Sequence, residues 1–143
     1  MKVKEMIGAL QLHKKNTDSH QLMTVWGEHL DCAKVLEEYP RPQMVRSNYT
    51  ILNGMWNYAF TSSSRMPEKY DGEILVPFSP ESYLSGVHRQ LQPKEFLWYQ
   101  RTITLQEIPD KQRLILHFGA CDERCRVYIN GAQAGFHSGG YQA

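Results

Sequence analysis

The sequence has little excess of either charge, since 16 lysine and arginine residues stand against 15 aspartate and glutamate residues. A protein that binds nucleic acid through its phosphates carries a basic surplus, so that class is disfavoured. No apolar run approaches the roughly 20 residues that cross a bilayer, which disfavours a membrane span. With 41% hydrophobic and 22% charged residues, the 143-residue chain has the composition and length of one globular domain.

Cysteines and short catalytic motifs are also scarce. The three cysteines, Cys32, Cys121 and Cys125, cannot all pair within one chain, and such a sparse set favours a reducing compartment. The apolar stretch at residues 6–10 is shorter than the roughly 7–15 apolar residues of a signal peptide. We therefore expect a cytoplasmic protein. The sequence has no Gly-x-Ser-x-Gly motif and no phosphate-binding loop, and we expect no cofactor.

From residue 49 onward, short apolar segments alternate with turn residues and no helical period is visible. Asn53-Gly54 and Asn130-Gly131 are dipeptides typical of tight hairpin turns. The pattern predicts an all-β fold, an antiparallel β-sandwich or jelly roll. The expected strands are 49–52, 55–60, 73–77, 96–105, 113–118, 124–129 and 132–137.

The N-terminal part predicts little regular structure. A short helix is expected at residues 3–10, and Asp31 is expected to cap a helical turn over residues 33–38 that Pro40 ends. We expect residues 22–48 to form an irregular lead-in and residues 49–143 to form the β-sandwich. The segment 79–93 is expected to be a long functional loop.

Three groups of side chains are candidates for chemistry. His117, Cys121 and Cys125 are spaced four apart, and His137 is a possible fourth zinc ligand, but buried thiols beside a strand histidine are the favoured interpretation. We therefore expect no metal site. Glu81, in the long loop, is a carboxylate placed to meet a ligand, but a single carboxylate cannot supply the acid and base pair of a glycosidase. The third group consists of aromatic side chains, whose ring faces could stack on sugar rings, although most aromatic residues on strands lie in the core. These are Trp26, Trp56, Trp98, Tyr49, Tyr58, Tyr99 and Tyr128.

A series of co-linear motifs resembles the N-terminal part of bacterial glycoside hydrolase family 2 enzymes, the relatives of β-galactosidase and β-glucuronidase. The resemblance covers residues 22–141, and it depends on the order and spacing of the motifs rather than on any one of them. Residues 1–21 lie outside it. The motifs occupy residues 22–31, 35–43, 52–59, 74–82, 84–86, 98–101, 116–122, 127–131 and 135–141.

This resemblance implies a galactose-binding-like jelly roll, the sugar-binding domain that precedes an immunoglobulin-like domain and a catalytic TIM barrel. The two catalytic glutamates of the family lie on that barrel, so no residue of this chain is expected to be catalytic. The chain is expected to stop before the closing strands of its own jelly roll. By position, the loop after Pro77 implies a role at the substrate periphery for Glu81, Ser82 and Tyr83, and more weakly for His137 and Tyr141.

The expected function is that of a non-catalytic sugar-binding domain, a fragment of a retaining O-glycosyl hydrolase that acts on β-galactosides, β-glucuronides or related glycosides. Its expected partners are a β-glycoside and the catalytic domains of the parent enzyme. Two alternatives stay open. One is a freestanding carbohydrate-binding module, and the other is a structural or interaction fragment that self-associates through exposed strand edges.

Overall fold

The computed structural model describes residues 23–105 and 110–143, so the helix expected at residues 3–10 lies outside the described part. The chain divides into two compact units, one ending at Thr102 and the other spanning Ile103–Ala143, and each is described by itself. Among the described residues, no helix has the length and apolar character needed to span a membrane.

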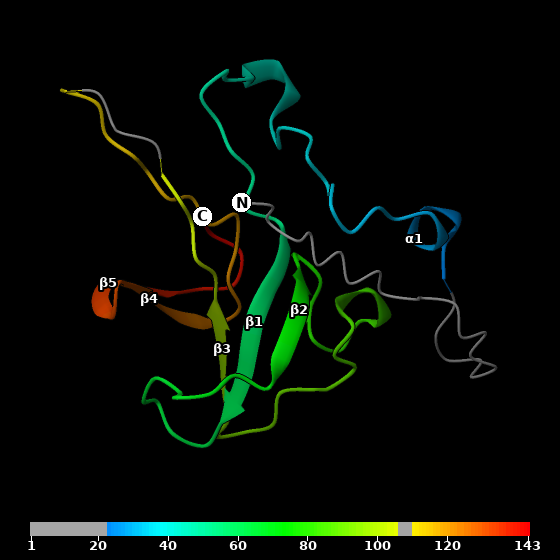
Figure 1. Cartoon of the computed structure of the whole chain (residues 1–143), viewed down its shortest axis with the longest axis vertical. Coiled ribbons are helices and arrows are strands. Elements are labelled where there is room, and N and C mark those ends of the chain that lie inside the picture. Colours follow the sequence, from blue (N-terminus) through cyan, green and yellow to red (C-terminus); the bar gives the residue numbers. More distant parts are fainter. Residues whose placement is uncertain (1–22, 106–109) are drawn as a thin grey trace, which may run out of the picture. The chain divides into compact units, whose positions relative to one another are not determined.

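The first unit is built on a three-stranded antiparallel sheet, in which β1 lies between β2 and β3 (Figure 1). Its strands are β1 (Gly54–Thr61), β2 (Gly72–Val76) and β3 (Phe96–Gln100). The strands predicted at residues 55–60 and 73–77 are thus confirmed. β1 occupies the centre because it pairs along one edge with β2 and along the other with β3.

The core of this unit is small and centres on β2. Ile74 is fully buried, and its neighbour Leu75 is nearly so. Because successive strand residues point to opposite faces, this pair shows that β2 is covered on both sides. Ala59 of β1 and Val35 of the lead-in segment are also buried apolar residues. The irregular lead-in therefore contributes to the core.

The helical turn predicted over residues 33–38 is wrong. Asp31 accepts a hydrogen bond at Oδ1 from the Ala33 amide at 2.9 Å, and its carbonyl accepts one from the Lys34 amide. These contacts close a local turn instead of starting a helix, a competition typical of aspartate side chains. Leu36 then has a φ of 47°, which no right-handed helix accommodates. From residue 23 to residue 48 the lead-in contains two short helices, α1 (Val25–Glu28) and a 3₁₀ turn at Pro42–Met44.

The hairpin predicted at Asn53-Gly54 is also wrong, and residues 49–52 form no strand. Gly54 instead begins β1 with a φ of +111°. Side chains hold the preceding segment: Arg101 Nη1 donates to the carbonyls of Leu52 and Asn53 at 2.7 and 2.8 Å. Asn53 Nδ2 in turn donates to the Val35 carbonyl at 3.0 Å. These backbone groups are thus satisfied by side chains and not by a strand ladder.

β3 is half as long as the strand predicted over residues 96–105. Its pairing with β1 ends at Gln100, opposite Asn57, and the two side chains are joined by an amide hydrogen bond of 2.7 Å. The side chain of the next residue, Arg101, is the one that reaches back to the carbonyls before β1. The apolar residues Ile103 and Leu105 of the predicted strand are exposed in the second unit.

The second unit is a β-hairpin of β4 (Arg124–Ile129) and β5 (Ala132–Ser138), which confirms the two strands predicted there. Asn130 and Gly131 join them with φ values of 50° and 83°, the positive pair that a type I′ turn requires. The ladder contains one bulge. Tyr128 pairs with Gln133 but Val127 pairs with Gly135, so Ala134 is an extra residue on β5.

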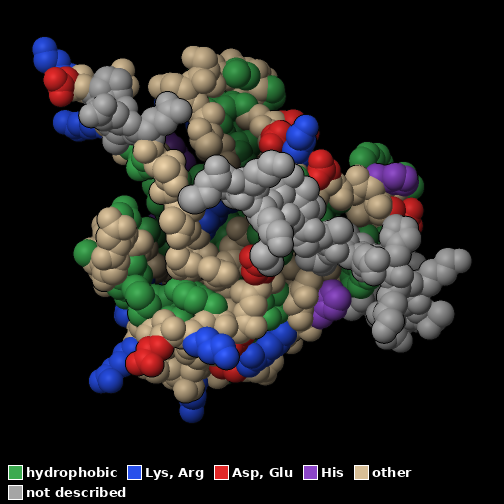
Figure 2. All heavy atoms as spheres, in the orientation of Figure 1, with side chains coloured by type: hydrophobic (Ala, Val, Ile, Leu, Met, Phe, Trp, Pro, Cys, Tyr) green, Lys and Arg blue, Asp and Glu red, His purple; other side chains and the backbone are tan. Residues whose placement is uncertain are grey.

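No strand forms at residues 113–118, contrary to prediction. The apolar residues Leu114, Ile115 and Leu116 of this segment are exposed, as is Phe136 of β5 at 60%. Hydrophobic side chains accordingly appear at the surface in the region of β4 and β5 (Figures 1 and 2). An alternating pattern needs a layer against which its apolar face can pack, and in the described part of the second unit these side chains are exposed instead.

The fold is therefore mostly β, as predicted, with two small antiparallel sheets and little helix. The described residues form no closed sandwich, and the jelly roll stays a prediction, as do the expected domain boundaries.

Candidate functional site

The turn that follows β2 holds three of the predicted site residues. Ser82 caps the 3₁₀ turn Tyr83–Ser85, because its hydroxyl accepts a hydrogen bond from the Ser85 amide at 3.2 Å. Gly86 ends the turn in the left-handed conformation, with a φ of 79°. The Ser82 hydroxyl is thus occupied by the backbone, while Glu81 is exposed beside it.

Ser85 fixes the conformation of this segment from within. It is 1% exposed, and its hydroxyl donates toward the Ser82 carbonyl at 2.8 Å and lies 3.3 Å from the Pro80 carbonyl. The same oxygen accepts a hydrogen bond from the Val87 amide at 3.1 Å. A buried hydroxyl with these partners ties both arms of the turn together.

Tyr83 presents an aromatic pair together with His88. Their rings stack with centroids 4.9 Å apart and an interplanar angle of 16°. His88 Nε2 donates to the Tyr83 carbonyl at 3.0 Å, which fixes the imidazole over the phenol ring. Tyr83 is half-buried and His88 is exposed, so part of this pair faces solvent. A flat aromatic surface of this kind suits the apolar face of a sugar ring.

Arg89 joins the end of this segment to its start and to the sheet. Its amide donates to the Pro80 carbonyl at 2.9 Å, and its guanidinium lies 3.9 Å from the centre of the Phe60 ring. The same guanidinium forms a salt bridge of 2.5 Å with Glu95. The loop from Pro80 to Arg89 is therefore a closed, internally bonded turn with its two ends adjacent.

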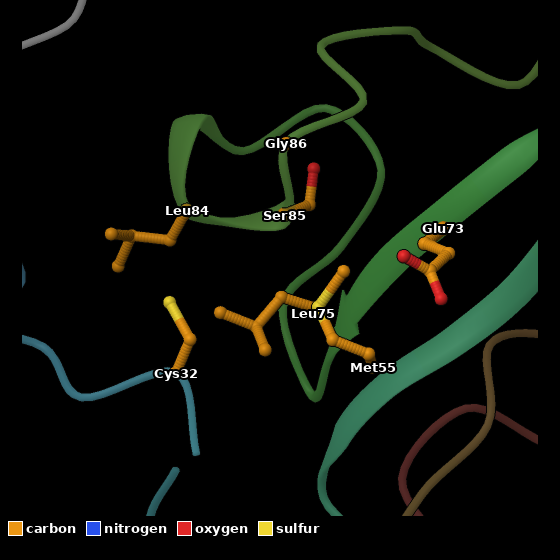
Figure 3. Close-up of a pocket in the computed structure, with 7 residues that line it drawn as sticks. All are labelled: Cys32, Met55, Glu73, Leu75, Leu84, Ser85 and Gly86. Atoms are coloured by element: carbon orange, nitrogen blue, oxygen red, sulfur yellow. The ribbon is translucent and has the colours of Figure 1, made fainter. Parts of the chain in front are cut away.

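A small cavity lies between this turn and the sheet (Figure 3). It has a volume of about 60 Å³, enough for water but not for a sugar. The Cys32 sulfur points toward Leu84 and Leu75, whereas the Glu73 carboxylate lies on the opposite side (Figure 3). Met55, Ser85 and Gly86 complete its lining.

A larger cavity, of about 370 Å³, lies within the second unit. Its wall is mostly apolar, with side chains such as Val127 and Phe136, and it includes two thiols and two imidazoles. His137 faces Cys125 directly across the hairpin, because the bulge at Ala134 shifts the register by one residue. The polar members of the wall are His117, Cys121, Cys125, His137 and Gln142.

The two thiols of this cavity interact. Burial, the side chain of Cys125, and the charges of Cys125 and Asp122 together raise the pKa of Cys121 from 9.0 to about 11. All the causes disfavour the charged form, so Cys121 stays a protonated thiol at neutral pH. The cavity therefore combines a persistent S–H donor with a neighbouring sulfur.

The zinc arrangement weighed for His117, Cys121, Cys125 and His137 does not form. All four line one cavity. Nevertheless, over residues 23–105 and 110–143 no three histidine, cysteine or acidic side chains converge to hold a metal ion. The strand and turn geometry spreads the four-residue spacing that a helix would have aligned.

The aromatic side chains follow the core expectation in part. Trp56 and Trp98 are half-buried, and their indole N–H groups donate to the Leu52 carbonyl at 2.8 Å and to Thr61 Oγ1 at 3.1 Å. Trp26 of α1 is 84% exposed instead.

The structure brings Glu81, Ser82 and Tyr83 together in one turn, and it places His137 and Tyr141 in the second unit. His137 lines the larger cavity, and Tyr141 is completely exposed. Sequence reasoning missed two residues that organise the turn, Ser85 and His88. Ser85 lies three residues after its capping serine, a spacing that signals an N-cap, whereas nothing in the sequence marks His88 as the stacking partner.

Comparison with known proteins gives a distant relation. No protein-family model matches the chain. A β-glucuronidase of Streptococcus agalactiae serotype V (strain ATCC BAA-611 / 2603 V/R) is 24% identical over 106 residues, which cover 72% of this chain and 17% of that protein. The chain therefore spans less than one fifth of the length of this curated relative. The resemblance to family 2 glycosidases is supported at this level: the chain is distantly similar to part of such an enzyme.

Proposed function

We propose that this chain is the sugar-binding segment of a family 2 glycosidase that acts on β-glucuronides, β-galactosides or related glycosides, and that it is non-catalytic by itself. The observation that carries the proposal is the similarity over 106 residues to a β-glucuronidase, of which those residues cover 17%. The β-rich structure with little helix agrees with this assignment. The parent enzyme would be a retaining hydrolase whose two glutamates lie outside this segment.

The proposal also includes the fold of this segment. A galactose-binding-like jelly roll would give the apolar side chains of residues 114–118 and of β5 a layer to pack against, and these side chains are exposed in the described chain. We also propose a cytoplasmic location, which the three free cysteines support.

Within the proposal, the turn after β2 lies at the substrate periphery. Tyr83 would stack on a sugar ring, since its ring is held parallel to that of His88 and part of the pair faces solvent. Ser82 would act as a positioning residue, because its hydroxyl is already bound to the backbone. Glu81 is exposed and available for a sugar hydroxyl. His137 and Tyr141 are secondary candidates.

The test is a calorimetric titration of the full chain with methyl β-glucuronide and methyl β-galactoside. We expect saturable binding in the millimolar range and a loss of roughly threefold to tenfold in affinity for Tyr83→Ala, the worth of one stacked aromatic contact. Tyr49→Ala is the matched control, because Tyr49 is a partly exposed tyrosine of the lead-in that packs edge-on against Tyr39. Flat titrations with both sugars would contradict the proposal.

Catalysis needs a separate assay. The purified chain is expected not to hydrolyse nitrophenyl glycosides, and turnover by a preparation free of contaminating hydrolase would show that it holds a catalytic site of its own. Binding without turnover fits both the segment and a freestanding carbohydrate-binding module. Expression joined to the catalytic domains distinguishes them, since only the segment is expected to alter KM of the joined enzyme.

A second candidate function is association through the second unit. Leu114, Ile115, Ile129 and Phe136 are all more than half exposed there, and a two-stranded sheet has two open edges. Sedimentation is expected to show a concentration-dependent dimer, and a monomer at all concentrations would contradict this candidate.

A further inference from the structure

Two of the three cysteines lie close together in the second unit. Cys125 is the second residue of β4, and Cys121 precedes it across a turn of three residues. Both side chains are half-buried, and both line the cavity of about 370 Å³. A cavity of this size admits a small oxidant to both sulfurs.

The Cys121 thiol is held in its protonated form. The charge of Cys125 is one of the causes that raise the pKa of Cys121, together with burial and the contact between the two side chains. Cys121 therefore keeps its proton at neutral pH. The thiolate is the nucleophile in thiol oxidation, so we assign the resolving role to Cys121 and the attacking role to Cys125, which has an imidazole as its cross-strand partner.

A base is available on the neighbouring strand. His137 is the direct cross-strand partner of Cys125, and paired residues project to the same face of a sheet. His137 Nε2 donates to the Gly139 carbonyl at 3.0 Å, so in the neutral ring Nδ1 is the nitrogen with a free lone pair. This nitrogen is the one that can accept a proton from the Cys125 thiol.

We propose that Cys121 and Cys125 are a redox-sensitive pair that a small peroxide converts to an intramolecular disulfide. The Cys125 thiolate attacks one oxygen of hydrogen peroxide, the O–O bond breaks, and the hydroxide that leaves takes up a proton to form water, which leaves a sulfenic acid. The Cys121 sulfur then attacks the Cys125 sulfur, the S–O bond breaks, and the second hydroxide takes the Cys121 proton. Two thiols and one peroxide thus give one disulfide and two waters.

Cys32 provides the internal comparison. It lies in the first unit, whose sequence holds no other cysteine, and it lines the cavity of about 60 Å³. Without a resolving thiol beside it, Cys32 is expected to stop at the sulfenic acid or go on to higher oxidation states.

The test uses the full chain and tryptic mapping by mass spectrometry. Arg124 lies between the two cysteines, so trypsin separates peptides 114–124 and 125–126, and Cys32 falls in peptide 16–34. After one equivalent of hydrogen peroxide, most of the material is expected to contain the first two peptides joined, with two hydrogen atoms lost, and reduction is expected to separate them. On a gel without reductant the oxidised chain should run as a monomer.

Two variants sharpen the result. Cys32→Ser is expected to form the same linked fragment at the same rate, whereas in Cys121→Ser a sulfenic acid should accumulate on Cys125 and be trapped by dimedone. The proposal is overturned if the peptides of the wild-type chain or of Cys32→Ser remain separate after peroxide, with both thiols still open to alkylation or separately overoxidised. It is equally overturned if the cross-link joins two chains or includes Cys32.

Discussion

Replacing Ser85 by alanine tests how the turn after β2 is held. Ser85 is 1% exposed, and its hydroxyl contacts two carbonyls and the Val87 amide. The two carbonyls keep other donors, since Pro80 accepts from the Arg89 amide and Ser82 from the Ser85 amide. The part-buried Val87 amide loses its acceptor. Leaving this donor unpaired costs about 1–3 kcal/mol, which is the expected loss in the free energy of unfolding of the first unit.

Urea unfolding followed by tryptophan fluorescence measures this loss. All three tryptophans lie in the first unit, so their emission reports on that unit alone. With a slope near 1 kcal/mol per molar urea for a unit of this size, the midpoint should fall by roughly 1–3 M. Ser64→Ala makes the same change at an exposed position and is expected to shift stability by less than about 0.5 kcal/mol. Equal midpoints for the two variants would show that the Ser85 hydroxyl does not stabilise the turn.

Two further changes probe the second unit. Gly131→Ala places a side chain at a φ of 83°, which costs about 1–2 kcal/mol, so hydrogen exchange should show a roughly tenfold loss of amide protection in β4 and β5. Gly119→Ala is the control, because an added Cβ there meets nothing within 4 Å, and it should leave this protection unchanged. Equal protection in the two variants would contradict the turn assignment. Since the folded-state pKa of Cys121 is raised from 9.0 to about 11, the folded form binds the extra proton between these values, and its contribution to stability is complete below pH 9 and lost as the pH rises to 11. Between pH 9 and pH 11 the free energy of unfolding should therefore fall less in Cys121→Ser than in the wild type, as measured by urea unfolding at each pH. Parallel pH curves of the two proteins would contradict the raised pKa.

The two Asn-Gly pairs show how far local chemistry predicts this fold. Asn130-Gly131 forms the hairpin turn that its residues favour, because the flanking segments pair with each other. Asn53-Gly54 has the same residues but no hairpin, because Asn53 instead binds the Val35 carbonyl, 18 residues earlier in the chain. Such contacts between distant segments have no signature in a window of a few residues.

The candidate site was predictable only where it depends on residues that are close in the sequence. The long loop was predicted from its turn residues, and Ser82 and Tyr83 lie in a 3₁₀ turn within it, while their role at a sugar stays a prediction. The pairing of His137 with Cys125 could not be predicted from the sequence, because an unbroken ladder from the Asn130-Gly131 turn would place Phe136 opposite Cys125. The extra residue Ala134 shifts the register so that His137 lies opposite Cys125. A single alanine in a strand does not indicate a bulge in the sequence.

The proposed contact between a sugar and the turn after β2 is tested by an amide NMR titration of the full chain with methyl β-glucuronide. We expect saturable shifts concentrated in residues 81–88. No shifts at millimolar sugar, or saturable shifts confined to other residues, would contradict it.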